Sequence, residues 1–231
     1  FAYSPSRSTE AAQRLYAGAR EGCVLMSDGY EVYNKIASTN KLVHIGCWAH
    51  CRRYFHDALQ ALPKANRGPE QLAARFIALI GKLYRVEALA KEQGLDALAL
   101  LQSRQTHSVP VLQEIQALAL ANVHAVLPGS LLGKALHYLS SQWVKLERFV
   151  TSGNYPIDNN GCENSIRPFV IGRRNWLFAG ADTGAETLAR AMTVIETAKM
   201  NGLDPQAYLA DVLDRIQDHK INRLAELLPW N

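Results

Sequence analysis

The feature that most constrains this chain is an abrupt change of hydrophobic pattern near residue 50. Before it, short apolar runs at residues 24–26 and 42–45 stop at polar or glycine-containing turns, which is typical of buried β-strands. From residue 53 to residue 150, apolar side chains recur at helical spacing, and proline or glycine separates the segments. The pattern therefore predicts an α/β fold, mostly α, that contains a long all-α region.

The flanking segments have a different pattern. Residues 1–3 resemble the end of a strand, and a polar turn at residues 158–161 precedes a helix that Pro168 is expected to kink or interrupt. Amphipathic helices are expected at residues 185–200 and 205–220. We expect three parts: residues 1–52 and 151–231 form one core, and residues 53–150 are a helical insertion into it.

Composition limits which cellular compartment and which partners can be expected for this chain. The formal net charge of +4, from 25 Lys and Arg against 21 Asp and Glu, permits a polyanionic partner without requiring one. Four cysteines and no signal peptide favour a reducing, cytoplasmic compartment. Because the apolar runs are short and interrupted by charges, no membrane-spanning segment is expected.

Two acidic residues stand out by their context. Asp28 follows a predicted buried strand and precedes a glycine, so its carboxylate should project from a strand end, where α/β proteins build their sites. Glu163 lies in the first turn of a predicted helix. Taken alone, an Asp-Gly pair is typical of a turn, and a glutamate in a first helical turn is typical of a capping residue. Convergent carboxylates are nevertheless what metal-dependent nucleases use to hold two Mg²⁺ ions.

Three blocks of sequence carry a family resemblance. They are Ser-Asp-Gly-Tyr at residues 27–30, Gly-Cys-Trp-Ala-His-Cys-Arg-Arg-Tyr-Phe at 46–55, and Tyr-Pro-Ile-Asp-Asn-Asn-Gly-Cys-Glu-Asn-Ser-Ile-Arg-Pro at 155–168. The last residues, Leu-Leu-Pro-Trp-Asn at 227–231, extend it. In order and spacing, these blocks resemble the transposases of insertion sequence 66 over nearly the whole chain.

The resemblance implies an RNase H-like catalytic core with a DDE metal site, interrupted by a helical insertion. Asp28 and Glu163 match the second and third catalytic acids, which would hold two Mg²⁺ or Mn²⁺ ions together with the first acid. The chain starts at Phe rather than Met, so we expect that first acid to lie on a strand preceding Phe1. Residues 1–231 alone are then expected to lack cleavage activity, because a two-metal mechanism needs the bridging carboxylate.

Cys47 and His50 form a Cys-x-x-His pattern that resembles one found after the second acid in several DDE transposase groups. The resemblance implies a supporting position for both residues beside the active site. A zinc site that also uses Cys51 and a nearby histidine is the alternative, although no second cysteine pair follows downstream. Asn160 is a further candidate, since its side chain could orient the Glu163 carboxylate or the nearby backbone.

Several residues are candidates for binding DNA phosphates near the acids. Arg167 lies four residues after Glu163, so an intrahelical ion pair is the alternative role for it. Trp176 follows a basic turn and could stack on an unpaired base, or it could pack in the core. The complete set of candidates is Arg52, Arg53, Asn164, Arg167, Arg173, Arg174 and Trp176.

These observations predict a bacterial transposase that cleaves and joins strands at insertion-sequence ends. Its expected partners are transposon-end and target DNA, further copies of itself and accessory transposition proteins, and it would associate with the nucleoid when bound to DNA. Two alternatives stay open from the sequence. The chain could be a non-catalytic DNA-binding or assembly module of a transposase, or an unrelated RNase H-like nuclease.

Overall fold

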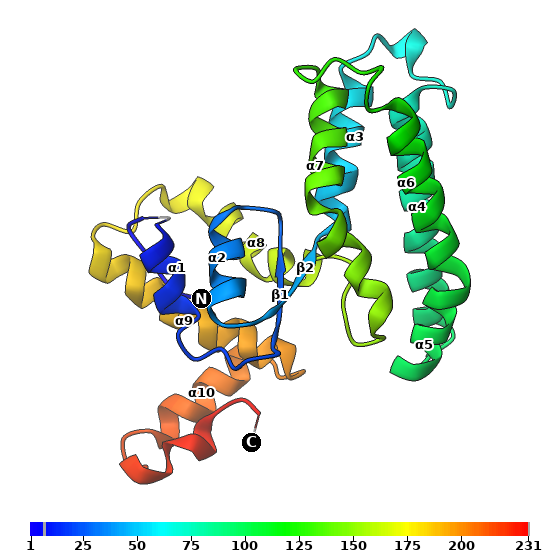
Figure 1. Ribbon diagram of the computed structural model, residues 1–231. Helices are drawn as coiled ribbons and strands as arrows, with labels where there is room; N and C mark the ends of the chain where they lie inside the picture. Colours follow the sequence, from blue (N-terminus) through cyan, green and yellow to red (C-terminus); the bar gives the residue numbers. More distant parts are fainter. Residues whose placement is uncertain (7, 231) are drawn as a thin grey trace. The chain divides into compact units, whose positions relative to one another are not determined.

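A computed structural model describes residues 1–6 and 8–230, apart from the side chain of Trp176 (Figure 1). These residues form two compact units. One comprises Ala12–Gly161, and the other joins Phe1–Ala11 to Cys162–Asn231. The first unit therefore contains the strands predicted at residues 24–26 and 42–45 together with the whole helical region, while the second contains Glu163.

Helices dominate both units. In chain order the elements are α1 (Thr9–Leu15), β1 (Val24–Ser27), α2 (Val32–Thr39), β2 (Val43–Gly46), α3 (Trp48–Gln60), η1 (Lys64–Asn66), α4 (Leu72–Glu92), α5 (Ala97–Ser103), η2 (Arg104–Ser108), α6 (Val109–Asn122), α7 (Leu131–Leu146), η3 (Glu147–Thr151), α8 (Asn160–Trp176), α9 (Asp182–Met200), α10 (Pro205–Arg215) and η4 (Ile221–Leu227).

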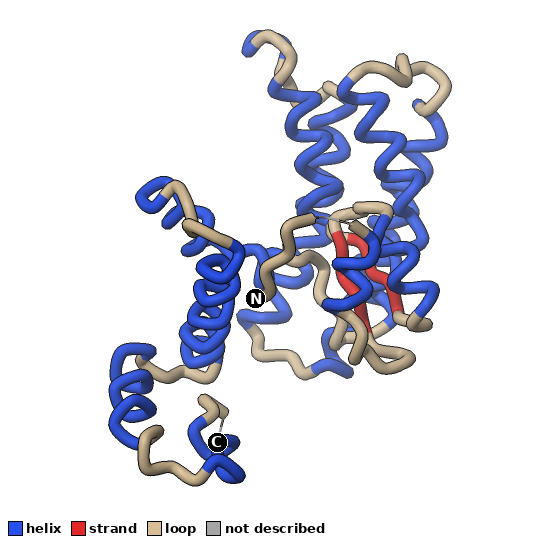
Figure 2. Tube along the Cα trace, turned by 90° about the vertical axis from the view of Figure 1, so that its left-hand side faces the viewer, coloured by secondary structure: helices blue, strands red, loops and turns tan. Residues whose placement is uncertain are grey.

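The two strands lie side by side and parallel, with Val24 opposite Val43 and Ser27 opposite Gly46 (Figure 2). Since α2 connects them, they form a β–α–β unit, the usual connection between parallel strands. Leu25 and Ile36 pack together as a small apolar cluster between β1 and α2. At β2, Gly46 lies so close to Leu146 of α7 that an added Cβ would be 3.1 Å from its side chain.

Helices α3, α4, α6 and α7 run side by side in Figure 1 and enclose the main core. Phe55 of α3 stacks on Phe76 of α4, with ring centroids 4.4 Å apart. The fully buried side chains of Ile80 and Ile115 continue this core between α4 and α6. The apolar positions that recur at helical spacing are therefore buried between neighbouring helices, as amphipathic helices require.

The expectation of a mostly helical α/β chain is confirmed, since the described residues form helices around one two-stranded parallel sheet. Within the described part of 53–150, every regular element is a helix. The strand expected at residues 1–3 was wrong: the Tyr3 hydroxyl donates to Asp182 of α9 at 2.7 Å, and no strand pairs with this segment in the described structure. No described helix is long and apolar enough to cross a membrane.

Pro168 does not end its helix, because α8 continues past it to Trp176. The segment α5–η2–α6 also continues through a proline, with Pro110 as the second residue of α6, after η2, a π-helical turn. Wider turns of this kind accommodate local breaks in the regular hydrogen-bond pattern of a helix.

Arg104 in η2 is buried, at 1% exposure, and its guanidinium makes four hydrogen bonds. Its guanidinium forms a bidentate pair with Glu87 of α4, with N–O distances of 2.8 and 2.7 Å. It also donates to the carbonyl oxygens of Phe149 and Ser152 at 2.8 and 2.6 Å. A planar donor fork of this kind suits several acceptors at once, so Arg104 joins α4, η2 and the end of η3.

A second buried polar contact links the two strands. The imidazole Nε2 of His44 lies 2.7 Å from the hydroxyl oxygen of Ser27. Burial lowers the pKa of His44 from 6.5 to about 4, and the positive charges of Lys145 and Arg148 add to the effect. His44 is therefore neutral in the folded protein near pH 7.

We expect the free energy of unfolding to fall between pH 6.5 and pH 4. The unfolded chain takes up a proton on His44 near its ordinary pKa of 6.5, whereas the folded chain does so only near 4. The contribution of His44 to the free energy of unfolding is thus fully present above pH 6.5. It is lost as the pH falls towards 4, and the total loss is at most about 3 kcal/mol. Urea unfolding at several pH values would measure it. His44→Gln should flatten the profile, and the exposed control His137→Gln should not.

The turn after β1 requires glycine. Gly29 has φ = 95°, a conformation that costs residues with a Cβ. A Cβ at this position would also lie 3.0 Å from Cε2 of Tyr138 and 3.3 Å from Cδ of Gln142, both in α7. Gly29 therefore meets a backbone requirement and a packing requirement together.

Gly29→Ala should destabilise the chain more than Gly22→Ala does. Gly22 also has a positive φ, of 80°, but a Cβ added to it would have nothing within 4 Å. Backbone strain alone should lower the free energy of unfolding by about 1 kcal/mol in Gly22→Ala. In Gly29→Ala the loss should be larger by at least about 1 kcal/mol, because Tyr138 must shift. Equal losses in chemical denaturation would contradict the close packing of α7 on this turn.

Candidate functional site

The carboxyl ends of β1 and β2 bring two of the predicted site residues to one edge of the sheet. Ser27 and Gly46 are paired in register, so Asp28 and Cys47 leave the sheet next to each other. Asp28 is exposed, and its Oδ1 accepts a hydrogen bond of 3.1 Å from the backbone N–H of Tyr30. An exposed carboxylate oriented by its own turn is available to bind a cation at this edge.

Trp48 brings the third sequence block to the same edge. Its backbone N–H donates to the carbonyl of Ile157 at 3.1 Å, and its indole N–H donates to the carbonyl of Leu146 at 2.9 Å. The fully buried ring packs edge-on against Trp143 and Phe149. The segment that precedes α8 is thereby held directly beside the start of α3.

Cys47 reinforces this connection. Its thiol donates to the Oδ1 of Asn159 at 3.0 Å, and the Nδ1 of His50 lies 3.3 Å from its sulfur. Since the thiol proton goes to Asn159, the sulfur is the acceptor toward His50 Nδ1. Burial raises the pKa of Cys47, so the thiol stays protonated and acts as a hydrogen-bond donor.

Asp158 organises the turn before α8. Its Oδ1 accepts from the backbone N–H of Asn160 at 3.0 Å. Its Oδ2 accepts from the Asn160 side-chain amide at 2.7 Å and from the hydroxyl of Tyr84 in α4 at 2.8 Å. The side chain of Asn160, a predicted supporting residue, thus bonds to Asp158 in this structure. The carboxylate at this helix start also suits the helix dipole.

Sequence reasoning missed two tyrosines in the helical region, where it identified no chemical motif. Tyr138 of α7 donates from its hydroxyl to the carbonyl oxygen of Asp28 at 2.8 Å, and Tyr84 reaches Asp158. Tyr84 lies four residues after the buried Ile80, and Tyr138 three residues after the buried Ala135, so each tyrosine shares a helix face with a buried apolar residue. A tyrosine on an apolar stripe needs a partner for its hydroxyl, and that was the available signal.

The zinc alternative finds no support in the described residues, where no three His, Cys, Asp or Glu side chains are grouped as metal ligands. Cys51 is fully buried in the main core beside Phe55. Burial also raises the pKa of its thiol, which disfavours the thiolate that zinc binds. Cys51 therefore serves as a packing residue.

The basic candidates fall in both units. Arg52 and Arg53 lie on α3 in exposed positions. Burial raises the pKa of Tyr84, and the positive charge of Arg52 opposes this rise in part. The others belong to α8 in the second unit, and the side chain of Trp176 lies outside the described residues. Its exposed candidates are Asn164, Arg167, Arg173 and Arg174, and Glu163 in its first turn is half-buried.

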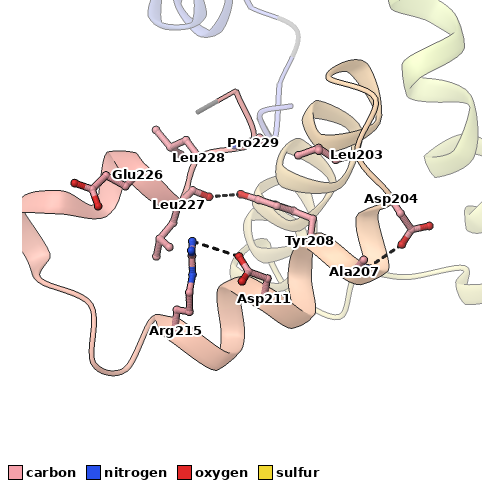
Figure 3. Close-up of a pocket in the computed structure, with 10 residues that line it drawn as sticks. All are labelled: Leu203, Asp204, Ala207, Tyr208, Asp211, Arg215, Glu226, Leu227, Leu228 and Pro229. Atoms are coloured by element: carbon pink, nitrogen blue, oxygen red, sulfur yellow. Dashed lines mark hydrogen bonds and ion pairs between the residues drawn. The ribbon is translucent and has the colours of Figure 1, made fainter.

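A separate pocket of about 340 Å³ lies between α10 and η4 in the second unit (Figure 3). The Tyr208 hydroxyl donates across it to the carbonyl of Leu227 at 2.6 Å, and Arg215 pairs with Asp211 at 3.3 Å. None of the residues predicted for the site lines this pocket. It is thus distinct from the strand edge described above.

Comparisons with known proteins agree with the sequence resemblance. A model of the transposase IS66 family matches residues 1–187, and one of the IS66 C-terminal element matches residues 193–230. Two relatives from Sinorhizobium fredii, the uncharacterized proteins y4jD and y4hP, are each 34% identical over 100% and 98% of this chain. A third, y4qI, is 33% identical over all of it.

The chain spans 45%, 42% and 42% of the length of these three relatives, which is less than half of each. No solved structure matches it. The family match covers most of the chain and includes all three sequence blocks. The chain belongs to the transposase IS66 family.

Proposed function

We propose that this chain contributes Asp28 and Glu163, two of three catalytic carboxylates, to a DDE transposase that cleaves and joins DNA at insertion-sequence ends. The observation that carries the proposal is the pair of backbone and thiol bonds from Trp48 and Cys47 to residues 157 and 159. They hold the segment leading to Glu163 at the edge where Asp28 leaves β1.

Covalent connectivity keeps Glu163 close to the end of the segment that precedes it. Gly161 belongs to the same compact unit as Asp28, and Glu163 follows it by two residues. Successive Cα atoms are about 3.8 Å apart, so the Cα of Glu163 lies within about 8 Å of that of Gly161. Glu163 therefore cannot be far from the end of the segment that Trp48 and Cys47 hold.

Mg²⁺ or Mn²⁺ suits these residues, because the exposed Asp28 carboxylate and Glu163 offer the hard oxygen ligands that both ions prefer. When bound, two such ions activate an attacking oxygen and stabilise the leaving one. The nucleophile would be water or a DNA 3′-hydroxyl. The parallel strands would be part of an RNase H-like core, whose first acid we assign to the portion of the relatives that this chain does not span.

Asp28→Asn and Glu163→Gln should each weaken Mn²⁺ binding by residues 1–231 at least about tenfold, since each removes a charged ligand. Calorimetry or electron paramagnetic resonance would measure the affinity. Asp57→Asn, an exposed change in α3, is the charge-matched control and should leave the affinity unchanged. In a protein that also contains the preceding segment, both site substitutions should abolish Mg²⁺-dependent cleavage. Affinity and cleavage insensitive to both would refute the proposed site.

We also propose that the arginines of α3 and α8 bind DNA phosphates. Replacing Arg173 and Arg174 together with Ala should lower DNA affinity and reduce the dependence of log K on log salt by about 1 to 2, since each lost phosphate contact removes about 0.9. The control is Arg75→Ala with Arg85→Ala, two exposed positions of α4, which removes the same charge. Fluorescence anisotropy at several salt concentrations would separate them. An equal slope for both variants would place Arg173 and Arg174 away from DNA.

A further inference from the structure

Two helices of the inserted region contact the loops that carry the proposed site, and both do so through a tyrosine hydroxyl. Tyr138 of α7 donates to the carbonyl oxygen of Asp28 at 2.8 Å. Tyr84 of α4 donates to the carboxylate of Asp158 at 2.8 Å, in the turn directly before α8. Tyr138 thus binds Asp28 itself, and Tyr84 binds the turn that leads into the helix of Glu163.

Tyr138 has little freedom to move. It is 9% exposed, and its ring stacks on that of Tyr54 in α3 with centroids 4.7 Å apart. Burial raises its pKa, so the hydroxyl remains a donor. The same ring lies against Gly29, where an added Cβ would approach to 3.0 Å. With Tyr30 N–H bonded to its Oδ1, Asp28 is held at both its carbonyl and its carboxylate.

Tyr84 is held in the same manner, from α4. It packs against the main apolar cluster, and burial raises its pKa, with the bond to Asp158 adding to the rise. Asp158 accepts three hydrogen bonds, one from Tyr84 and two from Asn160, the first residue of α8. Tyr84 therefore ties the start of α8 to α4.

We infer that Tyr138 and Tyr84 are positioning residues for the transposase site, acting through Asp28 and through the turn before Glu163. The inference rests on the proposed function of those two acids. A carboxylate already fixed in place loses less conformational freedom when it binds a cation, and small displacements of catalytic groups strongly reduce rates. In this arrangement the helical region fixes the position of Asp28 and of the turn that precedes α8.

The test removes each hydroxyl alone, in Tyr138→Phe and Tyr84→Phe. The control is Tyr208→Phe, which loses a bond of the same type, from Tyr208 to the carbonyl of Leu227 at 2.6 Å, with neither residue in the proposed site. Hydrogen–deuterium exchange would follow residues 28–30 and 158–160, and Mn²⁺ binding to residues 1–231 would be measured beside thermal stability.

We expect Tyr138→Phe to speed exchange at residues 28–30, and Tyr84→Phe at residues 158–160, by about fivefold, the effect of one hydrogen bond. Mn²⁺ affinity should fall by a similar factor in both variants, and the melting temperature should fall no further than in the control. The control itself should keep the wild-type Mn²⁺ affinity. A change of melting temperature alone would indicate a merely structural role and overturn the inference.

The two proposals fail differently. If Asp28→Asn and Glu163→Gln weaken Mn²⁺ binding while both tyrosine variants bind as wild type, the proposed function stands and the positioning role is refuted. If Mn²⁺ binding is insensitive to Asp28→Asn and Glu163→Gln, the proposed site is wrong, and the positioning role falls with it. An equal loss of affinity in Tyr208→Phe would show general destabilisation and would also refute the positioning role.

Discussion

The arrangement of the unit Ala12–Gly161 depends on the hydrogen bonds by which Trp48 holds the chain that returns from the helical region. The chain leaves the sheet after β2, forms the helices from α3 to η3, and returns at Ile157, where its carbonyl accepts from the Trp48 N–H. The indole N–H is bonded to Leu146 at the end of α7, so one buried residue joins the exit, the last long helix and the return. Fully satisfied buried donors of this kind define a single arrangement, because any alternative leaves them unpaired.

The buried guanidinium of Arg104, in η2, holds the returning segment at a second point. Arg104 pairs with Glu87 and reaches the carbonyls of Phe149 and Ser152, so the chain that returns from α7 is bonded to η2 and α4 before it reaches Ile157. A buried charge would be costly if it were unpaired, and here the guanidinium has an acidic partner and two carbonyl acceptors. The return segment is thus held at two successive points. This explains why a segment distant in sequence can be placed reproducibly at a strand edge.

The helical region therefore also contacts the segments that carry the proposed site. Its core supports Trp48, and its helices α4 and α7 supply the hydroxyls that contact Asp158 and Asp28. Residues that orient a functional group are most effective on rigid elements whose own side chains are locked by packing. Tyr138, stacked on Tyr54 and pressed against Gly29, meets this condition.

Much of the local structure could be read from the sequence, since it depends on short-range pattern. The runs before Asp28 and before Cys47 are strands, and residues 53–150 are helical where described. The strand expected at residues 1–3 was wrong, because strand formation needs a neighbouring partner that local pattern does not reveal. Pro168 lies inside α8 without ending it, so a proline by itself does not locate the end of a helix.

By itself, the sequence determined the family, the candidate acids and the alternation of strands and helices, because these reside in residue identity and spacing. Only the tertiary structure decided that Cys47 bonds to Asn159, that the Trp48 N–H bonds to Ile157, and that two tyrosines reach Asp28 and the turn before α8. The physical reason is that each hydrogen bond joins residues far apart in the chain. Its donor and acceptor meet only after the apolar stripes of α3, α4 and α7 have packed, and no local pattern encodes which helices will be neighbours.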